Sequence, residues 1–147
     1  MSFTQTSSQS LASTIQNLAT QAGLKVTVQN DDYVQCGLGL PNNRSQLVHI
    51  MSAGNFGNQN VAHIWTPVTQ LPGAGLPGEI ANGMLRENAN FKIGAFGVRE
   101  VQGSQLLVFF HNVVLESLDA SELMTVIGVV GTTGDQWEQK LGGGDQF

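Results

Sequence analysis

Charged residues are scarce in this sequence, and the positive ones do not cluster. Of its 147 residues only 12% are charged, with six Lys and Arg against eleven Asp and Glu, so the formal net charge is −5. Binding to nucleic acid or to an anionic membrane surface requires a focused basic patch. Because the six basic residues are scattered along the chain, we expect neither nucleic acid nor membrane as a partner.

Cysteine and long apolar runs are almost missing as well. Cys36 is the only cysteine, so no disulfide can form within the chain, as is usual in a reducing compartment. The first residues, MSFTQTSSQSLAST, contain no basic segment followed by an apolar core, and no apolar run approaches the ~20 residues of a membrane-spanning helix. These features predict a cytoplasmic protein without a signal peptide or a membrane span.

What the chain does contain is enough apolar material for one core. Its length suits a single domain over residues 1–147, and 41% of its residues are hydrophobic. Low charge leaves a surface rich in uncharged polar residues and glycine, which makes self-association easier.

The first half predicts one helix and four strands. Apolar residues recur at helical spacing over residues 8–22, and Gly23 follows where a left-handed residue often ends a helix. From residue 24 to residue 71, four short alternating segments are separated by Asn, Gly and Pro, which favours antiparallel hairpins. Pro67 is expected near the end of the fourth strand, where a missing donor is tolerated. Residues 72–78, PGAGLPG, are expected to connect this sheet to a helix.

The second half predicts helix, hairpin and helix. A helix is expected over Glu79–Ala89, followed by two strands joined at QGS with Gly103 at the tip. Asp119 with Glu122 three residues on forms a capping box for a long last helix. Together the elements predict an α+β fold, in which an antiparallel sheet of five to six strands carries the N- and C-terminal helices on one face.

Three histidines are the main candidates for chemistry. If GNFGNQ forms a hairpin tip, His49 and His63 lie almost opposite each other and could begin a zinc or copper site, whereas His111 belongs to another hairpin. No acidic residue or cysteine accompanies them, so ordinary strand histidines are the preferred interpretation. Cys36 lies in an alternating strand and is expected to fill the core. We therefore expect no catalytic residues, no cofactor and no metal, with a metal-dependent sensor or enzyme using His49 and His63 as one alternative.

One predicted strand, residues 105–114, is apolar on both faces. A solvent-facing antiparallel strand normally alternates, so its second face should be covered by something other than the helices. We expect a homodimer that buries part of the sheet. The uncovered parts of this strand and of residues 61–68 are the predicted binding surface for a partner protein, with Trp65, Phe109 and Val113 as candidate anchors.

The order of elements and several local motifs resemble the YbjN-like family of sensory transduction regulators. The resemblance lies mainly in residues 79–141, where RENANF at 86–91 ends a helix, a hairpin follows, and SLDASEL leads into the long last helix. It implies a single domain of the type III secretion chaperone-like fold that pairs with itself and binds other proteins, without agreed catalytic residues. We expect a non-enzymatic protein-binding module, regulatory or chaperone-like. A dedicated type III secretion chaperone is a further alternative.

Overall fold

The computed structural model describes residues 9–142 as three helices, a short 3-10 turn and six strands. In chain order these are α1 (Leu11–Ala22), β1 (Thr27–Asn30), β2 (Tyr33–Leu40), β3 (Arg44–Phe56), β4 (Gln59–Gln70), α2 (Gly78–Asn88), β5 (Ala95–Val101), β6 (Ser104–Val114), η1 (Leu115–Ser117) and α3 (Ala120–Leu141).

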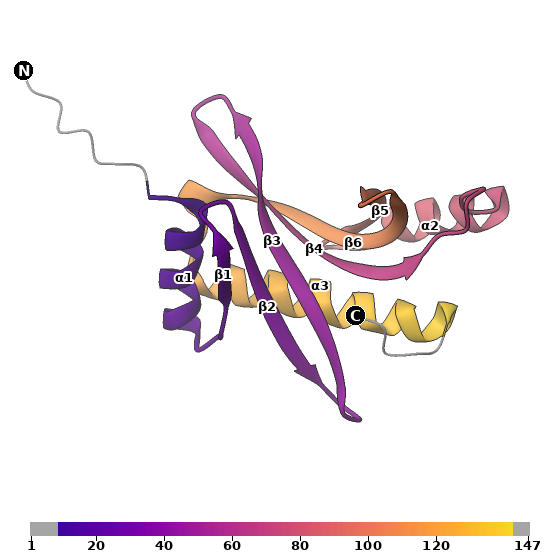
Figure 1. The fold of residues 1–147 in the computed structure, drawn as a ribbon, viewed down its shortest axis with the longest axis horizontal. Coiled ribbons are helices and arrows are strands. Elements are labelled where there is room, and N and C mark those ends of the chain that lie inside the picture. The colour runs from indigo at the N-terminus through magenta and orange to yellow at the C-terminus, as the bar shows by residue number, and fades with distance from the viewer. Residues whose placement is uncertain (1–8, 143–147) are drawn as a thin grey trace, which may run out of the picture.

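The six strands form one antiparallel sheet in the order β1-β2-β3-β4-β6-β5. Helix α3 runs across one face of this sheet with α1 beside its first half, while α2 lies at the far end next to β5 (Figure 1). The α+β fold predicted from the sequence, with its N- and C-terminal helices on one face, is therefore confirmed. None of the helices within residues 9–142 lies on the opposite face, which we call the open face.

The predicted helix and turn signals lie close to their expected places. Ser10 caps α1 by accepting a hydrogen bond from the Ser13 N–H at 3.1 Å, so the helix begins slightly later than its apolar periodicity indicated. Asp119 caps α3 in the same way, accepting from the Glu122 N–H at 2.7 Å. The β5–β6 turn places Gln102 and Gly103 at positive φ, as a tight hairpin of two residues requires.

The core lies between the helices and the covered face of the sheet. Strand residues such as Val34, Ile50, Ile64 and Phe109 are fully buried there against the apolar side of α1 and α3. Helix α3 approaches the sheet closely because two of its contact positions are glycine. A Cβ at Gly134 would stand 2.3 Å from Thr66 Cγ2.

A buried polar layer also joins α3 to the sheet. Arg44 at the start of β3 forms ion pairs with Asp135 at 2.8 Å and with Glu138 at 3.0 Å. Beside them, the buried Gln46 donates to Thr66 Oγ1 and to the Pro67 carbonyl, both at 2.8 Å. The Arg44 ion pairs tie α3 to the start of β3, whereas the Gln46 bonds join β3 to β4 beneath the helix.

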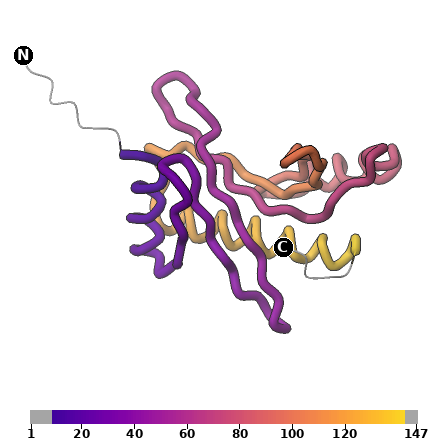
Figure 2. Tube along the Cα trace, viewed as in Figure 1, coloured from indigo at the N-terminus to yellow at the C-terminus, as the bar shows by residue number. Residues whose placement is uncertain are grey.

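Two hairpins extend beyond the helices in opposite directions. Figure 2 shows the β3–β4 hairpin on one side of the molecule and the β2–β3 turn on the other. Pro67 lies three residues before the end of β4, next to an irregularity in the β4–β6 pairing between Pro67 and Thr69. The predicted place of this proline near a strand end is therefore correct, although β4 is a central strand.

Candidate functional site on the open sheet face

The open face carries a dense group of aromatic and polar side chains from five strands. In an antiparallel sheet, paired residues share a face, and successive residues alternate between faces. Since Ile50, Ile64 and Phe109 face the helices, their neighbours along each strand face outward. The outward residues that contact one another, here called the open-face cluster, are Tyr33, Gln35, His49, Met51, His63, Trp65, Arg99, Phe110 and Asn112.

A chain of hydrogen bonds and stacked rings runs across β2, β3 and β4. Gln35 Nε2 donates to the Tyr33 hydroxyl oxygen at 2.7 Å, and that hydroxyl lies 2.5 Å from His49 Nδ1. The His49 ring stacks on the Trp65 ring with centroids 4.3 Å apart and planes inclined by 20°. This arrangement leaves Trp65 only 5% exposed, although no helix covers it.

Arg99 covers the cluster from the edge strand. Arg99 on β5 pairs with Leu106 on β6, and Leu106 pairs with Gln70 on β4. Gln70 lies five residues after Trp65, so in a flat sheet Arg99 would be displaced from Trp65 by about 16 Å along the strand direction. Its guanidinium nevertheless stands 4.8 Å from the Trp65 ring centroid, and its Nη2 lies 3.6 Å from Met51 Sδ. A flat sheet does not allow these contacts, so the sheet curls toward its open face and brings β5 over β4 and β3.

A second group lies beside the first on β4 and β6. His63 Nδ1 lies 2.5 Å from Asn112 Oδ1, which can only accept, so His63 donates in this bond. The His63 and Phe110 ring centroids are 5.1 Å apart. Phe110 also lies over Gly97 on β5, where an added Cβ would come within 2.9 Å of the Phe110 ring. The glycine therefore makes room for an aromatic ring lying flat on the sheet.

Both histidines of the open-face cluster are held in the neutral form. Burial first, and the Arg99 charge second, lower the pKa of His49 to about 4. The pKa of His63 is also lowered, mainly by burial and with a smaller contribution from Arg99, against the raising effect of its bond to Asn112. Since Gln35 donates to Tyr33, the Tyr33 hydroxyl proton is available to neutral His49 Nδ1.

The predicted pairing of the histidines differs in register from the structure. His49 pairs with Trp65 and His63 pairs with Met51, so the two histidines share the open face as diagonal neighbours rather than opposite each other. His111 lies on the helix-covered face, where its Nδ1 accepts from the Gly94 N–H at 3.2 Å. Within residues 9–142, no three His, Cys, Asp or Glu side chains gather as metal ligands would.

The three predicted anchor residues are split between the two faces. Trp65 belongs to the open-face cluster, but Phe109 and Val113 face the helices and are 0% and 5% exposed. Phe109 packs in the core, with its ring edge-on to Phe91 and Phe96 at 5.0 and 5.4 Å. Phe109 and Val113 are therefore core residues, and their assignment to the binding surface was wrong by one position in the alternation.

Sequence reasoning missed Tyr33 and Arg99 as members of the candidate site, and it preferred Phe109 to Phe110 as the anchor on β6. Once Trp65 is placed on the open face, the β4–β6 register puts Phe110 beside it, and Phe110 adjoins the predicted anchor Phe109 in the sequence. Tyr33 had a similar signal, because it alternates with the buried residues of its strand. Arg99 had none, since its contact with Trp65 depends on the curl of the sheet.

Cys36 lies on the covered face and is 1% exposed. Burial raises the pKa of its thiol, which keeps it protonated and weakly nucleophilic. This placement agrees with the expected role of a small apolar filler of the core.

A second candidate surface is an apolar groove between α2 and β5. It has a cavity volume of about 200 Å³ and is lined by residues that include Leu76, Met84, Leu85, Val98 and Leu107. Leu85 and Val98 are 65% and 56% exposed, which is unusual for large apolar side chains. The adjacent edge of β5 is partly closed by Asn88, whose side-chain amide accepts from the Phe96 N–H at 2.7 Å and donates to its carbonyl at 3.3 Å.

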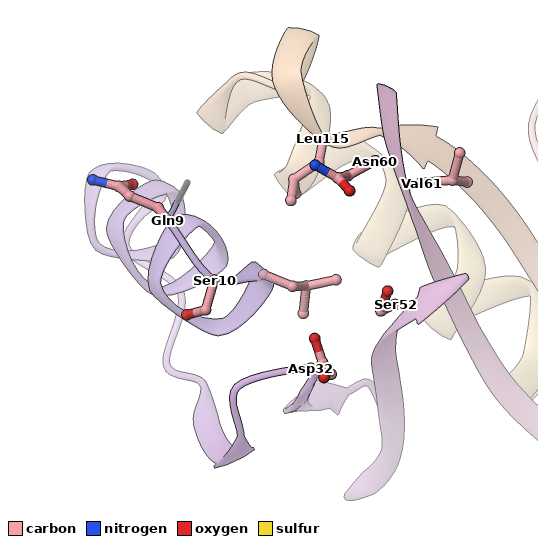
Figure 3. Close-up of a pocket in the computed structure, with 8 residues that line it drawn as sticks. Gln9, Ser10, Asp32, Ser52, Asn60, Val61 and Leu115 are labelled. Atoms are coloured by element: carbon pink, nitrogen blue, oxygen red, sulfur yellow. The ribbon is translucent and has the colours of Figure 1, made fainter. Parts of the chain in front are cut away.

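A third hollow, of about 190 Å³, lies at the start of α1. Figure 3 shows Ser10 and Asp32 on one side of it and Asn60 with Leu115 on another. Two of its polar residues, Ser10 and Asn60, already have partners. Ser10 caps α1, and both oxygens of Glu116 accept hydrogen bonds from Asn60 at 2.8–3.0 Å.

Among residues 9–142, none of the helices combines the length and the apolar character that crossing a membrane requires.

Comparisons with known proteins do not assign this chain to a family. Neither a protein-family model nor a curated protein matches the sequence. The resemblance to the YbjN-like family and to the type III secretion chaperone-like fold therefore stays a prediction from the motifs of residues 79–141.

Proposed function

We propose that this protein is a non-enzymatic, cytoplasmic protein-binding module that acts as a homodimer and receives partner polypeptides on its open face. The observation that carries the proposal is the open-face cluster itself. Large aromatic side chains give much contact area for little loss of conformational freedom, and here they stand on a sheet face that no helix covers. Phe110 and Tyr33 are partly exposed and held in place by neighbours, as binding residues need to be.

Trp65 supports this surface from beneath. With 5% of its area exposed, it contributes little direct contact to a partner while Arg99 and His49 lie against it. Its role in the proposal is to fix the positions of those two side chains. The partner would contact their outer atoms together with the Phe110 ring.

The homodimer is assigned to the groove between α2 and β5. Leu85 and Val98 lie at this groove, and the neighbouring Ile80 is 44% exposed. Clustered exposed apolar side chains mark association sites on soluble proteins. Pairing two copies at this end of the sheet would bury these side chains and leave the open face of each copy accessible.

Light scattering on two matched variants tests the dimer. At micromolar concentration the wild type is expected at twice 15.6 kDa, and Leu85→Glu at 15.6 kDa, because a charge in an apolar interface is not compensated. Met124→Glu is the control, since Met124 is 48% exposed on α3, away from this groove. A wild-type monomer, or a Leu85→Glu dimer, contradicts the assignment.

Capture of a partner from the native host tests the open face. Phe110→Ala is expected to lose a partner that Met124→Glu still retains, with unchanged circular dichroism in both. A partner that Phe110→Ala retains at wild-type levels would contradict the proposed use of this face.

A further inference from the structure

Among the paired strand residues that the structure describes, Arg99 is the one on the open face that is charged at neutral pH. Apart from the two neutral histidines, the outward positions of the six strands hold apolar residues and uncharged polar residues, and Arg99 is the exception. Glu100, its acidic neighbour, belongs to the opposite face. On a chain whose net charge is −5, the centre of the open face is therefore locally positive.

This charge has no acidic partner in residues 9–142. The ion pairs of that region belong to Arg44, and no carboxylate lies within 4.0 Å of the Arg99 guanidinium. Arg99 instead rests on the Trp65 ring and on Met51 Sδ, which occupy the face of the guanidinium and one of its N–H groups. A guanidinium has five N–H donors in one plane, so the remaining donors are available to an acceptor.

Other hydrogen-bonding groups stand beside this charge. His49 stacks on the same Trp65 ring and joins the Tyr33 hydroxyl, while Asn112 and His63 lie on the Phe110 side. Their contacts hold the side chains in place before any ligand arrives, which reduces the entropy lost on binding. The group that such a surface complements is a planar carboxylate, which pairs with arginine through two parallel hydrogen bonds.

We infer that Arg99 anchors a carboxylate-binding site on the open face, and that its occupant is an acidic segment of the partner polypeptide. A single cation on an acidic protein suits one carboxylate, whereas a polyanion such as nucleic acid would need several cations. The apolar surface of Phe110 beside the charge suits the neighbouring side chains of a peptide. The inference rests on the proposed function and names the partner chemistry of that same face.

Three pentapeptides distinguish a side-chain carboxylate from a C-terminal carboxylate as the group that binds Arg99. The first alternates Val and Glu and is blocked at both ends; the second replaces Glu by Gln; the third is the Gln peptide with a free C-terminal carboxylate. Binding is followed by NMR through the indole N–H signal of Trp65, with Trp137 on the other side of the sheet as internal reference. The Glu peptide is expected to shift Trp65 saturably and at least about tenfold more tightly than the Gln peptide, as a hydrogen bond between charged groups allows.

Two arginine variants give the control. Arg99→Gln is expected to lose the preference for Glu over Gln, whereas Arg86→Gln, an equal charge change at an exposed position of α2, keeps it. Tight binding of the third peptide alone would assign the site to a chain terminus and overturn the acidic segment. If Arg99→Gln turns a wild-type dimer into a monomer, the carboxylate belongs to a second copy and the separate partner is overturned.

The remaining outcomes distinguish this inference from the proposed function. Equal binding of the Glu and Gln peptides, lost in Phe110→Ala, would overturn the carboxylate site while leaving the open face as a binding surface. Absence of any Trp65 shift at millimolar peptide also overturns the carboxylate site, and the capture experiment with Phe110→Ala then decides the proposed function alone.

Discussion

His49 lies in an environment far from that of a free side chain. Its pKa is about 4 in the folded protein against 6.5 for an ordinary histidine, because burial and then Arg99 disfavour the charged ring. Between these values the unfolded chain binds a proton that the folded protein does not, so the free energy of unfolding falls as the pH is lowered from 7 toward 4. From pH 7 to pH 4.5, His49 alone is expected to cost about 2 kcal/mol, measurable by urea denaturation at both pH values.

The matched variant is His49→Gln, which keeps a hydrogen-bonding group facing Tyr33 but does not titrate. Its loss of stability between pH 7 and pH 4.5 is expected to be smaller than that of the wild type by about the same 2 kcal/mol. His63→Gln gives a comparison at a histidine whose pKa is also lowered. Identical pH dependence in the wild type and in His49→Gln would show that the His49 ring is not held neutral by its surroundings.

Residue by residue, the sequence could place strands but not always their faces. Alternation assigns Tyr33 and Val34 to opposite faces, because one is polar and the other apolar. In β6, by contrast, LLVFF is apolar at every position, so nothing local distinguishes Phe109 from Phe110. Only the long-range pairing of β6 with β4 distinguishes them. Phe109 pairs with Thr66, which lies under α3, and therefore faces the core. Phe110 pairs with Trp65 and therefore lies on the open face.

At the scale of elements, the fit of α3 to the sheet depends on Gly134. A Cβ there would stand 2.3 Å from Thr66 Cγ2, and Thr66 is held by its own bonds to Gln46 and to the Leu47 carbonyl. Because this β-branched side chain has little freedom to move, Gly134→Ala is expected to destabilise the protein by about 1–3 kcal/mol or more. Urea denaturation with an unchanged slope measures the effect.

Gly128 in the same helix provides a control, because its replacement by Ala is expected to change the stability in the opposite direction. A Cβ at Gly128 meets no atom within 4 Å, so Gly128→Ala only replaces a poor helix former by a good one. It is expected to stabilise the protein by about 0.5–1 kcal/mol. If Gly134→Ala were as stable as Gly128→Ala, the close packing of α3 on β4 would be refuted.

The elements themselves were predictable because their signals are local. Capping at Asp119, the hairpin at Gly103 and the turns between the first four strands depend on residues a few positions apart. The contact of Arg99 with Trp65 joins β5 to β4 across β6, so it depends on the relative placement of three strands. No short stretch of sequence encodes that contact, so the centre of the candidate site could not be derived before the structure.

At the scale of the whole molecule, the two edge strands of the sheet, β1 and β5, are covered by their neighbours to different extents. Strand β1 is short and exposed along its length, and α1 packs beside it. At the other end, Asn88 closes the edge of β5 only at Phe96, and Leu85 and Val98 remain exposed next to it. An exposed apolar edge favours association with another chain, which is why we place the proposed homodimer contact at this end.

A dimer of this kind makes thermal stability depend on protein concentration. When two folded copies bind each other and the unfolded chains do not, each tenfold rise in concentration adds about 1.4 kcal/mol per dimer. With the unfolding entropy typical of two chains of this length, the midpoint temperature of the wild type is expected to rise by about 2 °C per tenfold. Leu85→Glu, as a monomer, is expected to show a constant midpoint, and Met124→Glu to follow the wild type. Calorimetry over two decades of concentration distinguishes these cases, and a concentration-independent midpoint in the wild type would remove the homodimer from the proposal.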